Sequence, residues 1–353
     1  MAEGKYVTYE DSGVSIAAQD RAIAAFKDAV EGTHGPEVLA AVGSFCSAFK
    51  PGFAGLKEPV LVSSTDGVGT KVRLHVRFGT YDAAGRDLVA AVLNDVICSG
   101  AHPLFFLDCI SGHTVVPEVL QGFVSGMAEA CREAGCALVG GEIAELGDTY
   151  HRGEYDLVGF GVGLVDREEM LGPHRVQPGD VLIGLASTGV HCNGFSLVRR
   201  IFEHLSDDEW IAPRPDLGAS LRDVLLAPAR CYAAVMRKLQ AACRLTAAAH
   251  ISGGGLQDNV PRSLPAHLAA RIDGESVPVP PVFAIIQRAG PVAEQEMWHV
   301  FNMGVGFVIA LPPNEADTAV AVAREEGVGA HVIGEVVPAG DASRFEWSRG
   351  PGG

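Results

Sequence analysis

Basic residues are scarce in this sequence. Its 353 residues include 27 Lys and Arg against 43 Asp and Glu, which gives a formal net charge of −16 at pH 7. Proteins that bind nucleic acid or an anionic membrane surface present clustered positive charge, so this balance argues against both kinds of partner. The same balance implies that any phosphorylated ligand is held through divalent cations or backbone N–H groups.

Long apolar runs are absent as well, and none approaches the roughly 18 residues that a membrane-spanning helix needs. Residues 1–9 lack the apolar segment of a signal peptide. The eight cysteines, at 46, 98, 109, 131, 136, 192, 231 and 243, include no Cys-x-x-Cys pair. This spacing argues against a zinc site, and a chain this long and apolar does not need a disulfide framework. We therefore expect a cytoplasmic protein whose thiols are reduced and mostly buried.

The sequence does contain enough apolar material for more than one core. Hydrophobic residues make up 48% of the chain, and its length corresponds to about two domains of ordinary size. Residues 166–180 are polar and contain Pro and Gly, which is typical of a boundary. We predict a first domain over 1–168, a second over 169–340 and a disordered tail over 341–353. Both domains mix helices and strands, so the expected fold class is α/β or α+β.

Hydrophobic periodicity and turn residues locate the expected elements. In the first half we predict helices at 18–31, 82–99 and 117–134, and strands at 58–64, 104–110, 136–141 and 156–165. In the second half we predict strands at 181–187, 268–273, 303–311 and 330–337, and helices at 195–205, 228–242, 282–289 and 314–326.

The first candidate site is the segment DGVGTK, Asp66–Lys71, which follows the strand at 58–64. Its glycines would let backbone N–H groups approach an anion without an intervening Cβ atom. The order Gly-Thr-Lys differs from the Gly-Lys-Ser/Thr of a Walker A loop. A simple hairpin turn is the alternative interpretation.

Acidic residues form the second candidate site. Two acidic residues and an amide, Asp87, Asp95 and Asn94, lie on the predicted helix at 82–99. Asp108 and Glu142 lie at the ends of two apolar strands. A carboxylate at the end of an apolar strand is costly to bury unless it is paired or bound to a cation, and oxygen ligands suit Mg²⁺. The alternative is that these acids cap helices or face solvent.

Two further glycine-rich loops, 188–194 and 250–255, each separate a strand from a helix. A strand, a polar loop and a helix N-terminus make a typical anion site, in which His191 could donate to a phosphate or shuttle a proton. Asn193 could instead only cap the next helix. Three consecutive glycines, Gly253–Gly255, are hard to explain by packing because each costs about 1 kcal/mol of backbone freedom, so we expect an N–H nest there.

Two lysines, Lys27 and Lys71, are candidates for pairing with a triphosphate. The alternative for each is an ordinary solvated surface lysine.

Taken in order, these motifs resemble the phosphoribosylformylglycinamidine cyclo-ligase (AIR synthetase) family. The matching stretches span about residues 8–336: TYEDSGVSI, EPVLVSSTDGVGTK, DLVAAVLNDV, SGAHPLFFLD, AGCALVGGEIAEL, GEYDLVGFGVG, HCNGFSLVR, LLAPARCY, HISGGGLQDNVPR and FNMGVGF. Ordered agreement over nearly the whole chain is far more specific than any one motif.

The resemblance implies a homodimer whose N-terminal, ATP-binding halves pair. It also implies that ATP and Mg²⁺ are used to convert formylglycinamidine ribonucleotide to aminoimidazole ribonucleotide. Carried over by motif, it assigns catalysis to Asp66 and Asp95, metal binding to Asp66, Asp95 and Glu142, and nucleotide binding to Lys27, Gly67, Gly69, Thr70 and Lys71. The loop around His191 adds this residue to the catalytic candidates. From the loops we further infer that the ribose-phosphate substrate faces His191, Asn193, Gly253, Gly254 and Gly255.

The sequence departs from the usual family pattern at 109–114, at 143–147, at Cys192 and at His102. These positions adjoin the expected metal and substrate sites. Two alternatives to the cyclo-ligase therefore stay open. One is a paralogue that phosphorylates a different amide or small-molecule acceptor, and the other is a non-catalytic dimer that binds a nucleotide or regulates a partner.

Overall fold

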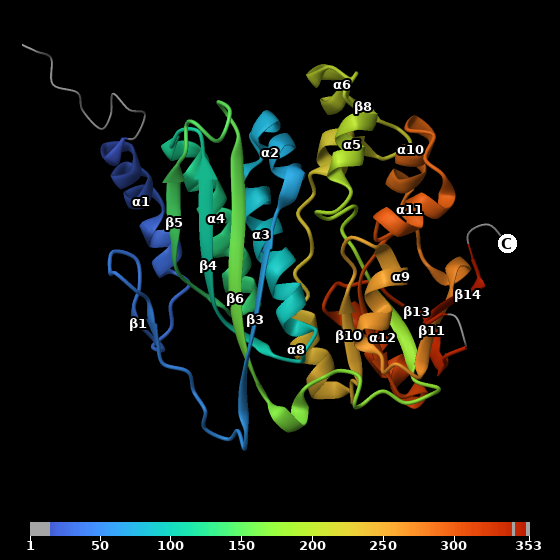
Figure 1. The fold of residues 1–353 in the computed structure, drawn as a ribbon. Coiled ribbons are helices and arrows are strands. Elements are labelled where there is room, and N and C mark those ends of the chain that lie inside the picture. The colour runs from blue at the N-terminus through green and yellow to red at the C-terminus, as the bar shows by residue number, and fades with distance from the viewer. Residues whose placement is uncertain (1–14, 341–342, 351–353) are drawn as a thin grey trace, which may run out of the picture.

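The computed structural model describes residues 15–340 and 343–350. Its described part contains a four-stranded and a six-stranded sheet with helices packed on them (Figure 1), so the expected mixed α/β class is confirmed. The motif at 8–16 and the predicted tail at 341–353 lie partly outside the described residues. Within the described residues, no helix has the length and apolarity that a membrane crossing requires. The division of the chain near 166–180 stays a prediction.

The first half builds the four-stranded sheet, in the order β3-β6-β4-β5. β4 and β5 are parallel, whereas β6 runs antiparallel to both β3 and β4. The elements of this half are α1 (Ile16–Glu31), β1 (Val38–Ala40), β2 (Ala48–Phe49), β3 (Pro59–Gly67), α2 (Val72–Phe78), α3 (Tyr81–Ile97), β4 (His102–Gly112), α4 (Pro117–Ala134), β5 (Ala137–Glu145) and β6 (Tyr155–Asp166).

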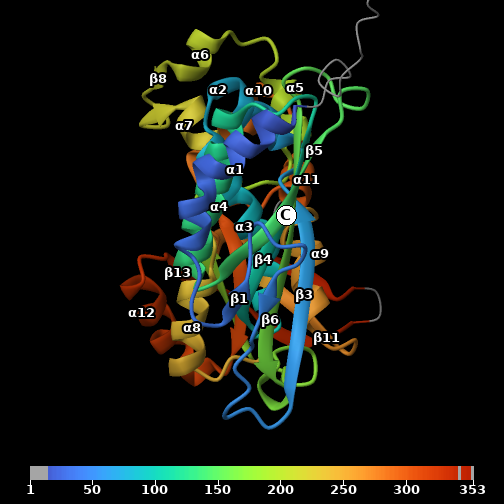
Figure 2. The same ribbon diagram turned by 90° about the vertical axis from the view of Figure 1, so that its left-hand side faces the viewer.

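Glycines on β6 let α3 lie unusually close to this sheet. A Cβ atom on Gly161 would lie 2.9 Å from Cγ1 of Val92, and one on Gly163 would lie 2.6 Å from Cγ1 of Val96. Real Cβ atoms do not come so near, so these positions exclude any larger residue. Helices α1, α3 and α4 all lie on this one side of the sheet (Figure 2).

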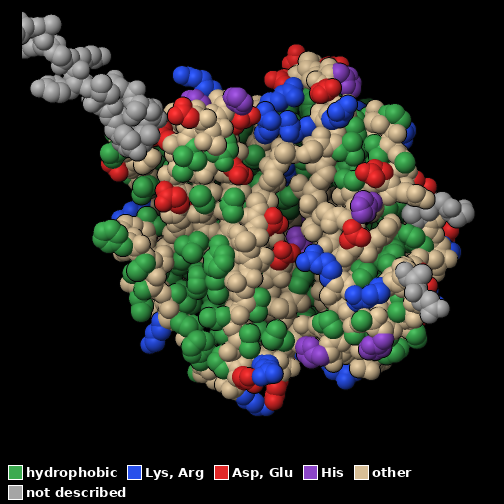
Figure 3. Space-filling model, in the orientation of Figure 1, with side chains coloured by type: hydrophobic (Ala, Val, Ile, Leu, Met, Phe, Trp, Pro, Cys, Tyr) green, Lys and Arg blue, Asp and Glu red, His purple; other side chains and the backbone are tan. Residues whose placement is uncertain are grey.

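The opposite face of the sheet is open over β3 and β6. Leu61 is 59% exposed, and Val158 and Phe160 are each 39% exposed. Figure 3 shows hydrophobic side chains gathered over this part of the molecule. Contiguous exposed apolar surface of this kind is typical of an interface.

The second half builds the six-stranded sheet, in the order β10-β12-β7-β13-β11-β14. All neighbouring strands are antiparallel except β11 and β14, which are parallel. The elements are β7 (Val181–Ala186), α5 (Phe195–Ile201), α6 (Asp207–Ile211), β8 (Pro213–Arg214), β9 (Ala219–Ser220), α7 (Leu221–Leu225), α8 (Ala233–Ala242), β10 (Ala247–His250), α9 (Gly255–Asn259), β11 (Leu268–Asp273), α10 (Pro281–Ala289), α11 (Glu294–Val300), β12 (Val305–Leu311), α12 (Ala316–Glu325), β13 (Ala330–Pro338) and β14 (Phe345–Arg349).

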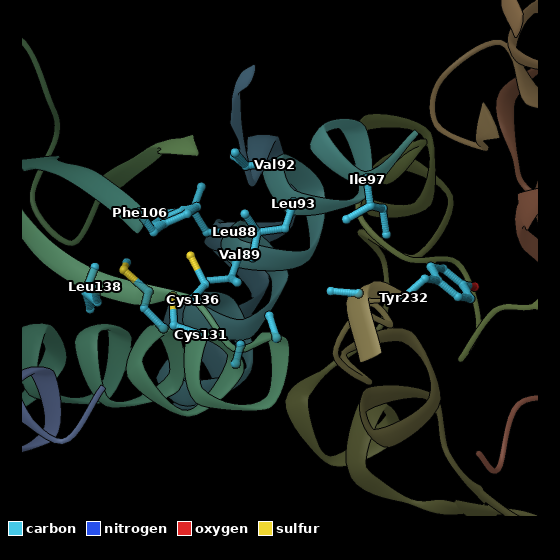
Figure 4. Packing of buried hydrophobic residues seen from close by; sticks show 14 of the residues in the cluster. Leu88, Val89, Val92, Leu93, Ile97, Phe106, Cys131, Cys136, Leu138 and Tyr232 are labelled. Carbon is cyan, nitrogen blue, oxygen red and sulfur yellow. The ribbon is translucent and has the colours of Figure 1, made fainter. Parts of the chain in front are cut away.

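One apolar core crosses from the first half into the second. Leu88 and Leu93 of α3 belong to the same buried cluster as Tyr232, Phe307 and Ile309 of the second half. Figure 4 shows part of this packing, with α3 side chains between Phe106 of the first sheet and Tyr232. Helix α3 is therefore the element that joins the two halves.

Three expectations about elements are wrong. The predicted disordered tail contains β14, because the backbone at Phe345–Arg349 pairs with β11. The helix expected at 228–242 begins only at Ala233, since the residues before it are bonded to α3. The glycine segment is partly strand: β3 extends through Gly67, which pairs with Val158.

Candidate active site

A small cavity of about 190 Å³ lies between the two halves of the chain. It brings together five of the residues singled out from the sequence, each on one of its walls: Asp66, Gly67, Gly69, His191 and Asn193. The first three come from the end of β3 and the turn that follows it, and the other two from the loop between β7 and α5. Two segments that are far apart in the sequence thus meet at one cavity, although their roles are not tested by this geometry.

Asp95 lies beside this cavity on α3. Its carboxylate is 43% exposed, accepts a hydrogen bond from Ser64 at 3.3 Å and faces Nδ1 of His250 at 2.9 Å. His250 lines the cavity together with Asp66. His250 was not among the predicted site residues, although it ends β10 and is the first residue of the loop at 250–255, a position that could have identified it.

His191 is buried and neutral rather than a free cation. Its Nε2 accepts hydrogen bonds from the backbone N–H groups of Thr188 at 3.2 Å and Arg230 at 3.4 Å, which places the ring proton on Nδ1. Burial, and then the nearby positive groups His250 and Lys71, lower the pKa of His191 to about 3. At neutral pH the ring can therefore donate from Nδ1 but cannot attract phosphate as an imidazolium.

Lys71 is not a solvated surface lysine, so that interpretation is wrong, whereas its pairing with a triphosphate stays a prediction. Its side chain is fully buried, and Nζ lies 2.7 Å from Asp87 and donates to the carbonyl of Ala227 at 3.0 Å. Asp87 also contacts Nε2 of His75 at 2.8 Å. Burial alone would raise the pKa of Asp87, but Lys71 and His75 lower it below its ordinary value. The lysine is therefore one partner in a buried ion pair.

Buried polar groups of α3 hold the segment at 227–232. Asp87 accepts from the N–H of Ala229 at 2.6 Å, and Asn94 donates to Arg230 at 2.8 Å and accepts from Tyr232 at 2.9 Å. The backbone N–H of Arg230 in turn donates to Nε2 of His191. This network fixes one wall of the small cavity, because the bonded segment lies between α3 and the His191 loop.

The triple-glycine loop has a clear packing reason, contrary to expectation. Gly254 and Gly255 have φ of +93° and +59°, and a Cβ atom on Gly255 would lie 2.1 Å from the carbonyl oxygen of Trp298. Asn259 donates to the carbonyls of Gly253 and Gly255 at 3.1 and 2.9 Å. The loop lies next to the cavity, since a Cβ atom on Gly253 would be 3.5 Å from Oδ1 of Asn193.

Thr70 and Lys27 lie outside the small cavity. The hydroxyl of Thr70 is 3.2 Å from that of Ser196 on α5. Lys27 is half exposed on α1, where Nζ lies 3.7 Å from Glu31.

Glu142 does not join Asp66 and Asp95, so the expected three-carboxylate centre is not formed within one chain. Strands β6 and β4 lie between β3 and β5. Gly141 lies against Asp108, so Glu142, the next residue along the strand, projects from the opposite face. Among residues 15–340 and 343–350, no group of three His, Cys, Asp or Glu side chains is placed to hold a metal.

Glu142 instead lines a second, larger cavity of about 820 Å³. Its walls are mostly apolar and come from α1, the segment 41–49, β4 and β5, and include Phe26, Phe45 and Phe105. Asp108 is the other acid there, and burial raises its pKa to about 7. The described residues give Asp108 no ion-pair partner, so a bound cation would stabilise its charged form.

The cysteines are unpaired, but fewer are buried than expected. All eight are free, Cys131, Cys136 and Cys243 are buried, and Cys46 is exposed.

Two domain families match the chain. The AIR synthase related protein N-terminal domain matches residues 54–165, and the C-terminal domain of the same name matches residues 177–345. Among solved structures, a thiamine-monophosphate kinase from Stenotrophomonas maltophilia K279a has a TM-score of 0.69 at 18% identity, covering 93% of this chain and 96% of its own. A hydrogenase maturation protein HypE in complex with ATP has a TM-score of 0.64 at 21% identity, covering 96% and 94%. These likenesses define an AIR-synthase-like fold.

Curated relatives narrow the class further. A phosphoribosylformylglycinamidine cyclo-ligase from Sorangium cellulosum is 47% identical over 95% of this chain and 97% of its own length. Another from Staphylococcus carnosus is 41% identical over 95% and 96%. The chain therefore belongs to the phosphoribosylformylglycinamidine cyclo-ligase family of AIR synthase related proteins, and the resemblance seen in its motifs is confirmed.

Proposed function

We propose that this protein is an ATP-dependent cyclo-ligase that converts formylglycinamidine ribonucleotide to aminoimidazole ribonucleotide. The observation that carries the proposal is the 47% identity to a cyclo-ligase over nearly the full length of both chains. The geometry supports it, because the two loops that the family pattern assigns to chemistry line one cavity.

Strand β6 lies between the strands that line the two cavities within one chain, so the reaction would divide between the larger cavity of one copy and the smaller cavity of the other copy in the homodimer proposed below. ATP would occupy the larger one, whose volume of about 820 Å³ lies in the range of nucleotide-sized pockets. The substrate's reacting end would occupy the smaller one. The formyl oxygen attacks the γ-phosphate and releases ADP, and the amidine nitrogen then attacks the same carbon, so that phosphate leaves and the ring closes. Both steps need positioned groups and charge neutralisation rather than a protein nucleophile.

Mg²⁺ fits the oxygen donors of this chain. Asp108 and Glu142 in the larger cavity, and Asp66 and Asp95 at the smaller one, would be the candidate ligands, and Mg²⁺ commonly takes only one or two carboxylates besides phosphate oxygens. Bound Mg²⁺ would neutralise the phosphate charge. The neutral His191 would help to shape the smaller cavity, because its Nε2 accepts from the backbone N–H groups of Thr188 and Arg230 and holds the ring in place.

We further propose a homodimer in which the open sheet faces pack together. The exposed Leu61, Val158 and Phe160 support it, because exposed apolar faces of this kind mark interfaces. Glu142, which projects from that face, would then lie near the second copy. A cytoplasmic location stays a prediction.

The proposal is tested with purified protein, ATP, Mg²⁺ and formylglycinamidine ribonucleotide. We expect aminoimidazole ribonucleotide and ADP in equal amounts, and a loss of at least about a hundredfold in kcat/KM for Asp95→Asn. Asp28→Asn, which changes an exposed acid on α1, is the matched control and should keep full activity. ATP hydrolysis without ring closure would instead favour a paralogue with another acceptor.

A further inference from the structure

Arginines gather in a third cavity, of about 510 Å³, between α2 and α5. Arg73 and Arg77 project from α2, Arg199 and Arg200 from α5, and Trp210 forms an apolar wall. Figure 3 shows the corresponding group of basic side chains at the top of the molecule. In a chain with a net charge of −16, four arginines lie around one cavity, whose lining includes a single carboxylate, Glu203.

Acidic neighbours neutralise only two of these arginines. Arg73 pairs with Glu154 at 2.7 Å, and Arg77 donates to Asp207 at 2.7 Å. The guanidinium groups of Arg199 and Arg200 form no ion pair or hydrogen bond with the described residues. Burial is the main reason why the pKa of Arg199 lies below its ordinary value, and the positive charge of Arg73 lowers this pKa further. An anion placed between these groups would relieve that repulsion.

The arginine cavity adjoins the small cavity through both segments that build it. Gly69 lines the small cavity, and Arg73 of the arginine cavity follows it within about one helical turn. Asn193 also lines the small cavity, and Arg199 follows it along α5. The Thr70 and Ser196 hydroxyls, 3.2 Å apart, lie between the two cavities. A ligand with a reactive group at one end and an anion at the other could span both.

We propose that the cavity lined by Arg73, Arg77, Arg199 and Arg200 binds the phosphate monoester of the ribonucleotide substrate, while the reacting amide end lies in the small cavity. This assignment rests on the proposed function for the identity of the substrate. It replaces the expectation that this acidic chain binds every phosphate through metal ions or N–H groups. Guanidinium groups match phosphate oxygens in bidentate geometry, which a backbone loop cannot supply at such charge density.

The first test is the double substitution Arg199→Gln/Arg200→Gln in the full chain. The KM for formylglycinamidine ribonucleotide should rise by roughly tenfold to a hundredfold while kcat falls by less than about threefold, because binding energy far from the reacting atoms is lost equally in ground and transition states. The KM for ATP should not change. The matched control is Arg222→Gln, because Arg222 is a partly exposed arginine of α7 that pairs with Asp223 outside the cavity.

A second measurement does not depend on turnover. Calorimetry with ribose 5-phosphate should show binding to the wild-type protein, loss of that binding in the double variant and no loss in Arg222→Gln. Equal substrate KM values for wild type and double variant, or a raised KM for ATP alone, would overturn the assignment. If the wild type binds ribose 5-phosphate through these arginines but makes no aminoimidazole ribonucleotide, the proposed function fails and the phosphate site stands.

Discussion

At the scale of single residues, Lys71 shows how burial changes the meaning of a charged side chain. It lies one residue after Thr70 in the glycine segment, yet its Nζ is enclosed by Asp87 and the Ala227 carbonyl. A buried ion pair contributes little net stability, but loss of one partner leaves an uncompensated charge in a low-dielectric interior. The pair therefore constrains which substitutions the site tolerates.

Replacing Lys71 by Met should lower the free energy of unfolding by about 3–5 kcal/mol, because Asp87 is left buried with only His75 and the Ala229 N–H as partners. Lys27→Met removes the same charge from the half-exposed surface of α1 and should cost less than about 0.5 kcal/mol. Urea unfolding of both variants measures the difference. Equal, small losses together with a weaker affinity of Lys71→Met for ATP would show that Lys71 contacts the nucleotide.

Residue chemistry was predictable where it depends on local order along the chain. Asp66, Gly69, His191 and Asn193 were identified because they follow strands, and they do share a cavity. The partnership of Lys71 with Asp87 was not predictable, because a sequence does not tell which charges are buried together. Whether His191 is charged also depended on its enclosure, which only the three-dimensional packing decides.

At the scale of elements, the sequence located the helices and strands whose ends carry residues typical of an element boundary, such as Pro or Gly. Helix α4 begins at Pro117 and ends before Gly135, whose φ of 70° suits glycine, and it was predicted with the same bounds. Helix α8 starts five residues late because Asp87 and Asn94 hold the preceding backbone. Strand β14 was missed since its pairing with β11 joins residues more than 70 positions apart.

The glycine loop before α9 allows two reasons for a glycine to be distinguished: close packing against a neighbouring group, and a backbone conformation with positive φ. Gly255→Ala places a methyl group against the Trp298 carbonyl and should lower the free energy of unfolding by about 3 kcal/mol or more. Gly327 also has a positive φ, 72°, but open space around it, so Gly327→Ala should cost only about 1 kcal/mol. Chemical denaturation separates the two. Similar losses would mean that backbone conformation alone requires glycine at 255.

At the scale of the whole molecule, the open face of the first sheet and the position of Glu142 belong together. The motif order indicated that Glu142 acts with Asp66 and Asp95, but two strands and the thickness of the sheet separate them in one chain. A sequence motif indicates what a residue does in a protein family, but it does not indicate which copy of the chain contributes that residue to a site. That depends on how the copies assemble, which local sequence patterns do not show.

Leu61→Glu should dissociate the proposed dimer. Each interface loses two buried leucines, one from each copy, which raises the dissociation constant by at least about a hundredfold. Val332 is 46% exposed on β13 of the other sheet, so Val332→Glu is the matched control and should leave the assembly unchanged. Sedimentation velocity gives the masses. A wild-type monomer at micromolar concentration would contradict the proposal.

The bare backbone of β6 has a consequence for any survey of random variants. Gly161 and Gly163 determine the distance between α3 and the sheet. They therefore also determine the position of Asp95, which is a residue of that helix. Substitutions there should be recovered among inactive clones alongside changes of the acid itself, although neither glycine would ever meet the substrate.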